Sequence, residues 1–179
     1  MTVDELLARY AAGERDFSEI RLSYIPDRIL RDVNLSGANF SKGNLGADWL
    51  ERVNLSGANL SEVNLRFTVF TNCDLSRANF DGAELYGERS WMEGCNCDGA
   101  SFRSAIMVMI NIVNCTFRNA IFDGSKWGGD SGLSDVDLTG ASFINSNLFN
   151  KSGSLTVARG GKIIFPDGKE VIFPGGSSQ

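Results

Sequence analysis

The chain has no histidine among its 179 residues, and this absence removes the side chain that enzymes use most often as a general base. It also lacks any run of 18 apolar residues, so no segment is expected to span a membrane. The first residues, Met1 to Glu5, are acidic and lack the apolar core of a signal peptide. We therefore expect a protein that is not exported and resides in the cytoplasm.

Concentrated positive charge is missing as well. The chain carries 17 basic and 22 acidic side chains, spread along its length, for a net charge of -5. Nucleic-acid binding is not expected, because it needs a clustered basic surface. Glycine-rich phosphate loops, nucleophile elbows and paired carboxylates are also absent. The sequence thus predicts no enzymatic activity, no cofactor and no metal site.

What the chain does contain is a five-residue repeat. A bulky apolar residue, here called the centre, recurs at every fifth position, and a small residue, its companion, lies two places earlier. Neither a helix nor a strand has this period. Two extra residues interrupt the repeat between Tyr86 and Ser90, and one more lies between Gly128 and Asp130. The centres are Leu30, Leu35, Phe40, Leu45, Leu50, Leu55, Leu60, Leu65, Phe70, Leu75, Phe80, Leu85, Met92, Cys97, Phe102, Met107, Ile112, Phe117, Phe122, Trp127, Leu133, Leu138, Phe143 and Leu148.

Units such as Ala38-Asn39-Phe40-Ser41-Lys42 resemble the pentapeptide-repeat family, whose consensus is roughly A-[DN]-L-x-x. The resemblance covers Leu30 to Leu148, with weaker units at Phe17 and Leu22. The run from Leu7 to Phe17 is similar to the openings of many cyanobacterial members. The resemblance implies an all-β solenoid: a right-handed quadrilateral parallel β-helix of about six coils, with centres and companions pointing inward.

Stacking of residues 20 apart, corrected for the insertions, supports four units per coil. One column of companions consists of alanine throughout, and its centres are phenylalanine or leucine. A second column contains only valine and cysteine. The alanine column is Ala38, Ala58, Ala78, Ala100, Ala120 and Ala141, and the second column is Val33, Val53, Cys73, Cys95, Cys115 and Val136.

Both ends of such a solenoid need covers, because an open coil exposes the core and unpaired backbone. Thr2 and Glu5 form a capping-box pattern, so residues 2–12 are expected to form a helix over the first coil. Residues 162–165 and 170–173 predict a β-hairpin, which either folds over the last coil or pairs with another subunit. The expected organisation is a helical cap (1–14), the β-helix (15–150), the hairpin (151–174) and a disordered tail (175–179).

Two inward columns hold groups capable of chemistry. Cys73, Cys95 and Cys115 share one column, with Cys97 as the next inward centre, and we expect them to be buried packing residues. A disulfide and a metal site are the alternatives. Arg28 and Asp48 are predicted neighbours in another column, as an ion pair or, alternatively, with Asp48 as a catalytic carboxylate.

Apolar side chains occupy one corner where the repeat expects polar surface. The candidate protein-binding residues there are Trp49, Phe67, Val69, Tyr86, Trp91 and Met109. These side chains form a partner site, brace the first insertion, or are scattered exposed residues.

The sequence therefore favours a non-enzymatic scaffold, a monomer or homodimer, that binds a protein partner through a flat face or this corner. The alternative is a regulator that mimics DNA, as some members of the resembled family do toward gyrase. Against it, residues 28–150 carry 14 acidic but also 10 basic side chains.

Overall fold

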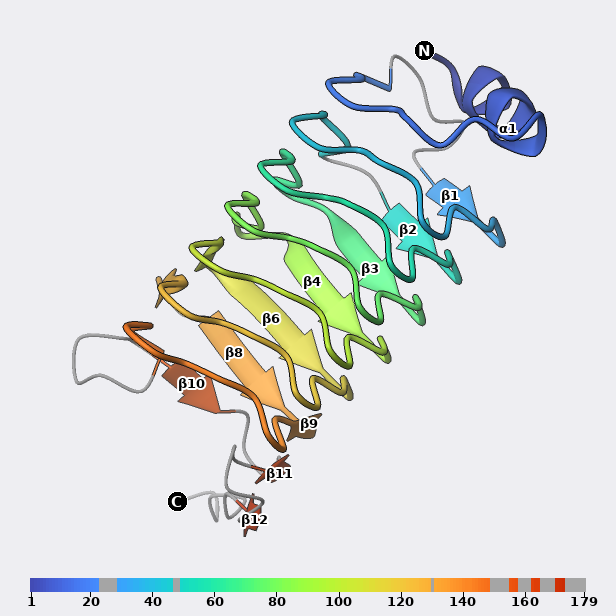
Figure 1. Cartoon of the computed structure of the whole chain (residues 1–179). Coiled ribbons are helices and arrows are strands. Elements are labelled where there is room, and N and C mark those ends of the chain that lie inside the picture. The colour runs from blue at the N-terminus through green and yellow to red at the C-terminus, as the bar shows by residue number, and fades with distance from the viewer. Residues whose placement is uncertain are drawn as a thin grey trace.

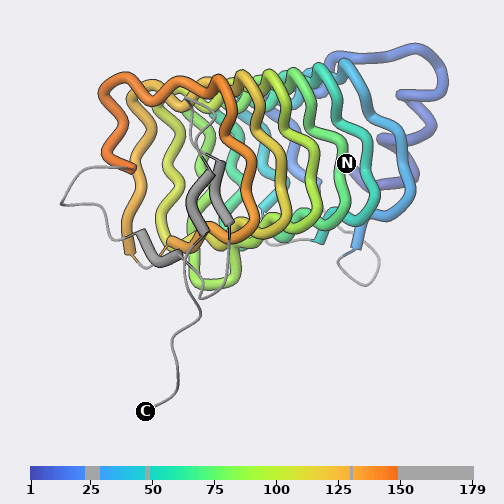
Figure 2. Tube along the Cα trace, turned by 90° about the horizontal axis from the view of Figure 1, so that it is seen from below, coloured from blue at the N-terminus to red at the C-terminus, as the bar shows by residue number. Residues whose placement is uncertain are grey.

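The chain winds into a parallel solenoid that begins under a short helix (Figure 1). This computed structural model describes residues 1–22, 29–46, 49–129 and 131–148, and the backbone of 155–157, 162–164 and 170–172. Each coil has four faces, which we number from the centres of one coil: Leu50 on the first, Leu55 on the second, Leu60 on the third and Leu65 on the fourth. Viewed from below, the coils follow one another as stacked turns (Figure 2).

The first face is a seven-stranded parallel sheet. Its strands stack coil on coil, with Leu30 beside Leu50, Leu50 beside Phe70, and so on to Leu133. In sheet order they are β1 (Ile29–Arg31), β2 (Trp49–Glu51), β3 (Val69–Thr71), β4 (Ser90–Glu93), β6 (Ile110–Val113), β8 (Ser131–Ser134) and β10 (Leu155–Val157).

The other faces form narrower ladders. The second and third consist mostly of single bridges, such as Asn34 to Asn54 and Asn39 to Asn59. The fourth includes the pair β5 (Ile106–Val108) and β7 (Lys126–Gly128). The architecture is the right-handed quadrilateral parallel β-helix that the sequence predicts, with the hand that parallel crossovers nearly always take.

The register of the strands confirms both insertions. Val69 pairs with Trp91, 22 residues later, where Trp49 pairs with Val69 at the regular 20. Glu88 and Arg89, within the first insertion, are exposed. A third offset is not apparent from the repeat: Asp16 pairs with Asn39, 23 residues on. The weak unit at Phe17 is therefore a real part of the first coil, and its ring stacks on that of Phe40.

Every described corner turns through a residue of positive φ, two places after a centre. On the second, third and fourth faces the amide of the next companion donates to the carbonyl of the centre, as Ala58 does to Leu55 at 3.0 Å. A β-turn of this kind needs a left-handed residue at its third position. Asparagine stabilises the turns before them: Asn54 Oδ1 accepts a hydrogen bond from the Ser56 amide. The five-residue period is thus one short strand plus one turn.

Small companions allow the aromatic centres to stack through the core. Phe80, Phe102, Phe122 and Phe143 form a column of parallel rings with centroids 4.8 to 4.9 Å apart. Ala100 and Ala120 in the neighbouring column are fully buried. Because coil spacing and ring spacing are nearly equal, each ring fills the height of one coil.

The N-terminal end is closed as the sequence predicts. Helix α1 (Val3–Ala11) begins with a capping box in which the Thr2 hydroxyl accepts from the Glu5 amide and the Glu5 carboxylate from the Thr2 amide. Leu6 is completely buried, and Leu7 and Tyr10 pack against the core. The Tyr10 hydroxyl donates to the Ser36 carbonyl at 2.9 Å, which ties the helix to the second face.

At the other end, β11 (Lys162–Ile164) adds in parallel to β9 (Val136–Asp137) on the second face, and β12 (Glu170–Ile172) pairs antiparallel with β11. This is the predicted hairpin, attached to the last coil. Its turn at Pro166 to Gly168, the tail at 175–179, and Arg28 and Asp48 lie outside the described residues. The domain boundaries stay predictions. Among the residues described, no helix has the length and apolar character of a membrane span.

Candidate functional site

The six apolar candidates gather where the fourth face turns into the first. Trp49, Val69 and Trp91 are neighbours in one ladder of the first face, each directly before an inward centre. Successive strand residues point to opposite sides, so burying the centres turns this ladder outward. Phe67 and Met109 lie at the preceding corner, and Tyr86 at the end of the fourth face.

The structure divides these six side chains into two groups. Trp49 and Phe67 are each 43% exposed, and Trp91 is 37% exposed. Val69, Tyr86 and Met109 are half-buried beneath and between them. The corner therefore has three outward aromatic side chains on a partly buried apolar base.

Phe67 and Met109 have φ values of 60° and 56°, a conformation that bulky residues rarely adopt. Both side chains lie over a glycine of the next coil. A Cβ built on Gly87 would lie 2.4 Å from Phe67 Cδ1, and one on Gly129 would lie 2.8 Å from Met109 Cγ. Glycine thus makes room for each side chain, which braces the corner from within.

Arg66 belongs to this corner although the sequence pattern suggested only a charge on an outer face. Its guanidinium carbon lies 4.6 Å from the centroid of the Tyr86 ring and 5.7 Å from that of Phe67. Its Nε is buried and has no acceptor among the described residues. The aromatic rings partly offset that cost through cation–π attraction. The stacking of residues 66 and 86 on successive coils is the signal that could have revealed this contact.

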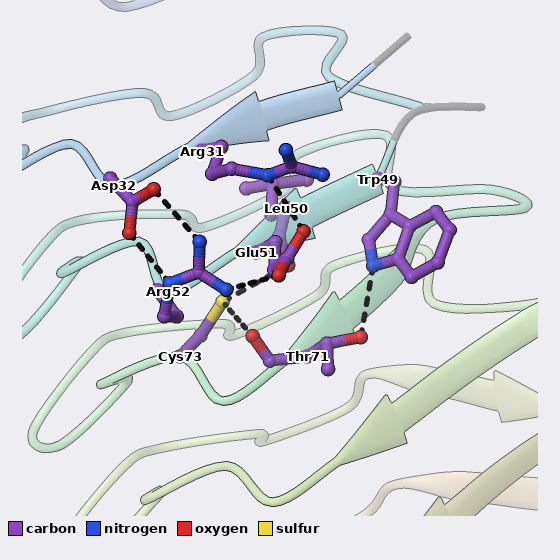
Figure 3. Close-up of polar contacts among 8 residues, drawn as sticks. All are labelled: Arg31, Asp32, Trp49, Leu50, Glu51, Arg52, Thr71 and Cys73. Carbon is purple, nitrogen blue, oxygen red and sulfur yellow. Dashed lines mark hydrogen bonds and ion pairs between the residues drawn. The ribbon is translucent and has the colours of Figure 1, made fainter.

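The two exposed tryptophans use their indole N–H groups differently. Trp49 Nε1 donates to Thr71 Oγ1 of the next coil at 2.9 Å (Figure 3). The buried Trp127 similarly donates to Ser125 Oγ. Trp91 Nε1 has no protein acceptor in the described part of the chain. One donor at the exposed corner is consequently free.

Charged residues line the far side of the first face. Arg52 holds Asp32 with two hydrogen bonds of 2.6 and 2.8 Å and also contacts Glu51, which in turn pairs with Arg31 (Figure 3). The hydrogen bonds from Arg52 lower the pKa of the exposed Asp32 carboxyl. Glu93, on the outward side of β4 with Trp91, forms no ion pair with any described residue.

The four cysteines are buried free thiols. Cys73, Cys95 and Cys115 lie in one column, and the Cys95 amide donates to Cys115 Sγ at 3.4 Å. The hydrogen bond with Cys115, together with burial, raises the pKa of Cys95 to about 12. Burial likewise raises the pKa of Cys97. Thiols in this state are poor nucleophiles, in agreement with a packing role.

The remaining inward polar residues have little capacity for catalysis. Thr68, Ser90 and Ser131 are buried in the column predicted to contain Asp48. Ser131 Oγ donates to the protein backbone, whereas Ser90 Oγ has no described partner. Among the residues described, no cluster of three or more metal-binding side chains is present. An outer hollow of about 490 Å³, away from the corner, is lined by Ser56, Gly57, Ser76, Arg77, Asn96 and Asp98.

Comparison with known proteins places the repeats. A family model described as pentapeptide repeats matches residues 50–87 and 88–126 in eight copies. No curated protein sequence matches the chain significantly.

Several solved structures are similar over most of the chain. HetL, a pentapeptide repeat protein of the cyanobacterium Nostoc sp. strain PCC 7120 involved in heterocyst differentiation regulation, is 21% identical. The match covers 94% of this chain and 99% of HetL with a TM-score of 0.37. QnrB1, a plasmid-mediated fluoroquinolone resistance protein, is 14% identical over 73% of this chain and 93% of its own, with a TM-score of 0.45. Rfr23 from the cyanobacterium Cyanothece 51142 is 18% identical over 80% and 92%, with a TM-score of 0.24. At these TM-scores the similarity says nothing about a shared partner.

Proposed function

Because this chain is a pentapeptide-repeat protein, we propose that it is a non-enzymatic scaffold that binds a protein partner through its apolar corner. One observation carries the proposal. Of the four large apolar side chains that are exposed among the described residues, Trp49, Phe67 and Trp91 lie together at this corner. The fourth, Ile144, lies on the third face near the C-terminal end.

The position of these aromatic residues supports a contact site. Outward positions elsewhere on the second and third faces are mostly asparagine, serine and aspartate, so the corner departs from the surface of the rod. Exposed tryptophan leaves a large apolar area in water, and partner binding removes it. Tryptophan is also enriched among the residues that dominate binding energy.

Bracing of the insertion accounts for only part of the corner. Val69, Tyr86 and Met109 are half-buried, and Phe67 covers Gly87. The two tryptophans, by contrast, stand on the outward side of their strands. The half-buried residues would hold the corner rigid, and the tryptophans would act as anchors.

The proposal is tested by affinity capture from native cell extract with the full chain, followed by mass spectrometry. The wild type is compared with the double variant Trp49→Ser/Trp91→Ser and with Ile144→Ser as a matched exposed-apolar control. We expect a partner that the wild type and Ile144→Ser retain and the double variant loses. Capture of the same proteins by all three, with unchanged thermal unfolding, would show the proposal to be wrong.

The DNA-mimic alternative has less support, because basic residues neutralise acidic ones along the rod. Arg52 pairs with Asp32, Arg31 with Glu51, and Arg118 with Asp137. An anionic surface that imitates DNA needs unpaired negative charge in regular stripes. A gyrase supercoiling assay with added protein separates the two functions: the scaffold proposal expects neither inhibition nor protection.

A further inference from the structure

From the ladder Trp49–Val69–Trp91 we infer the chemistry of the partner: a proline-rich segment in the polyproline II conformation, lying along the solenoid axis. This inference rests on the proposed function and makes it more specific. The three residues are called the tryptophan ladder below.

The spacing of the ladder matches this conformation. Trp49 and Trp91 lie two strand steps apart in the parallel register, which at ~4.8 Å per step gives about 9.6 Å. A polyproline II helix has three residues per turn and rises ~3.1 Å per residue, or about 9.3 Å per turn. Prolines at positions i and i+3 can therefore lie on the two indoles at once, with Val69 under the residues between them.

The free indole donor favours polyproline II over an α-helix. Trp91 Nε1 needs an acceptor from the partner, since no described residue of the chain supplies one. Backbone carbonyls in polyproline II make no internal hydrogen bonds and remain available, whereas those of an α-helix are already bonded. Trp49 has Thr71 as its acceptor and contributes only the face of its ring.

The charge beside the ladder indicates a further feature of the segment. Arg31, Asp32, Glu51 and Arg52 neutralise one another on the N-terminal coils. Glu93 follows Trp91 by two residues on the same outward side and has no described ion-pair partner. A basic residue flanking the prolines would complement it. The orientation is therefore fixed, with the basic end of the segment beside Trp91.

The test uses a fluorescein-labelled peptide of ten prolines preceded by two arginines, titrated with the full chain in a polarisation assay. One control peptide has glycine at every second proline, and another is an alanine-based helix with leucines seven residues apart and the same arginines. We expect the polyproline peptide to bind most tightly. Trp49→Ser and Trp91→Ser should each weaken it about thirtyfold, and Ile144→Ser should leave it unchanged.

Two milder variants separate the individual contacts. Trp91→Phe keeps an aromatic face but removes the donor, and should weaken binding about fivefold, as expected for one hydrogen bond. Glu93→Gln should weaken the arginine-bearing peptide but not one with alanine in place of the arginines. Both variants retain the fold if thermal unfolding is unchanged.

Three results would overturn the inference: no polyproline binding, equal binding by the tryptophan variants, or tighter binding of the helical peptide. Concentration-dependent dimerisation that is lost in Trp49→Ser/Trp91→Ser would also overturn it, because the occupant would then be a second copy of this chain. The scaffold proposal is judged separately. If the double variant still loses its captured partner, the corner binds protein and only the polyproline assignment is wrong.

Discussion

Phe67 shows how single residues shape the candidate site. A large side chain at φ 60° carries a backbone cost, and such outliers occur mostly where the surroundings hold them in place. Here Gly87 on the next coil leaves the space that the ring fills. The exposed aromatic surface at the corner therefore depends on a glycine 20 residues away.

This dependence predicts that Gly87→Ala is more destabilising than an ordinary corner substitution. Gly57 is the matched control: its φ is also positive, at 63°, but nothing lies within 4 Å of a new Cβ. We expect Gly57→Ala to lower the free energy of unfolding by about 1 kcal/mol and Gly87→Ala by about 3 kcal/mol. Urea unfolding measures both. If adding Phe67→Ala to Gly87→Ala restores no stability, the ring contact is not the cause.

The buried thiols predict a loss of stability at alkaline pH. The pKa of Cys95 is raised from 9.0 to about 12 in the folded chain, so folding favours the protonated thiol. Its contribution is fully present below the unfolded pKa and is lost as pH rises through the folded pKa, between about pH 9 and 12. Chemical unfolding at several pH values should show a shallower alkaline decline for Cys95→Val. Valine is the matched replacement, because Val53 and Val136 occupy the same column. Identical declines in the two proteins would contradict the prediction.

Among the elements, α1 performs the clearest single task. It covers the N-terminal end of the core with Leu6, which is completely buried, while Leu7 is only partly covered. The Tyr10 hydrogen bond and the capping box fix its position. The helix thereby protects a core that the repeat alone would leave open.

We therefore expect Leu6→Ala to lower the free energy of unfolding by about 3 kcal/mol, the range for a buried leucine. Leu7→Ala, the neighbouring control, should cost about 1 kcal/mol because less apolar area leaves water. Thermal and urea unfolding measure the difference. Equal effects at the two positions would mean that α1 does not close the core through Leu6.

The insertion between Leu85 and Ser90 also acts at the level of an element. It lengthens the connection from the fourth to the first face, and the register on the following coil shifts from 20 to 22 residues. Trp91 nevertheless aligns with Trp49 and Val69, because the extra residues lie at the corner and outside the ladder. The apolar column thus continues through the insertion.

In the whole molecule, each coil contacts only its two neighbours, so stability is a sum over adjacent pairs. Interior coils have a neighbour on both sides and include the stacked rings of Phe80, Phe102 and Phe122. The first and last coils rely on α1 and the hairpin for one side each.

This arrangement predicts a gradient of local opening that hydrogen exchange can measure. Amides of the coils from Phe70 to Phe122 should exchange at least tenfold more slowly than those of the first coil and of residues 138–148. Backbone bonds of similar length in all coils provide the internal comparison, such as 2.8 Å for both Leu35 to Asn54 and Cys97 to Thr116. Uniform exchange along the rod would indicate all-or-none opening and contradict the gradient.

The sequence by itself determined the four-faced solenoid, both insertions in the repeat, the buried thiols and the helix cap. It could do so because each inward position makes the same contact coil after coil, and residue type therefore reports location. The tertiary structure alone decided which of the six corner side chains face water, that Arg66 lies on Tyr86, and that Trp49 uses its N–H while Trp91 does not. Those features depend on side-chain orientations between residues 20 to 22 positions apart, which leave no periodic trace in the chain.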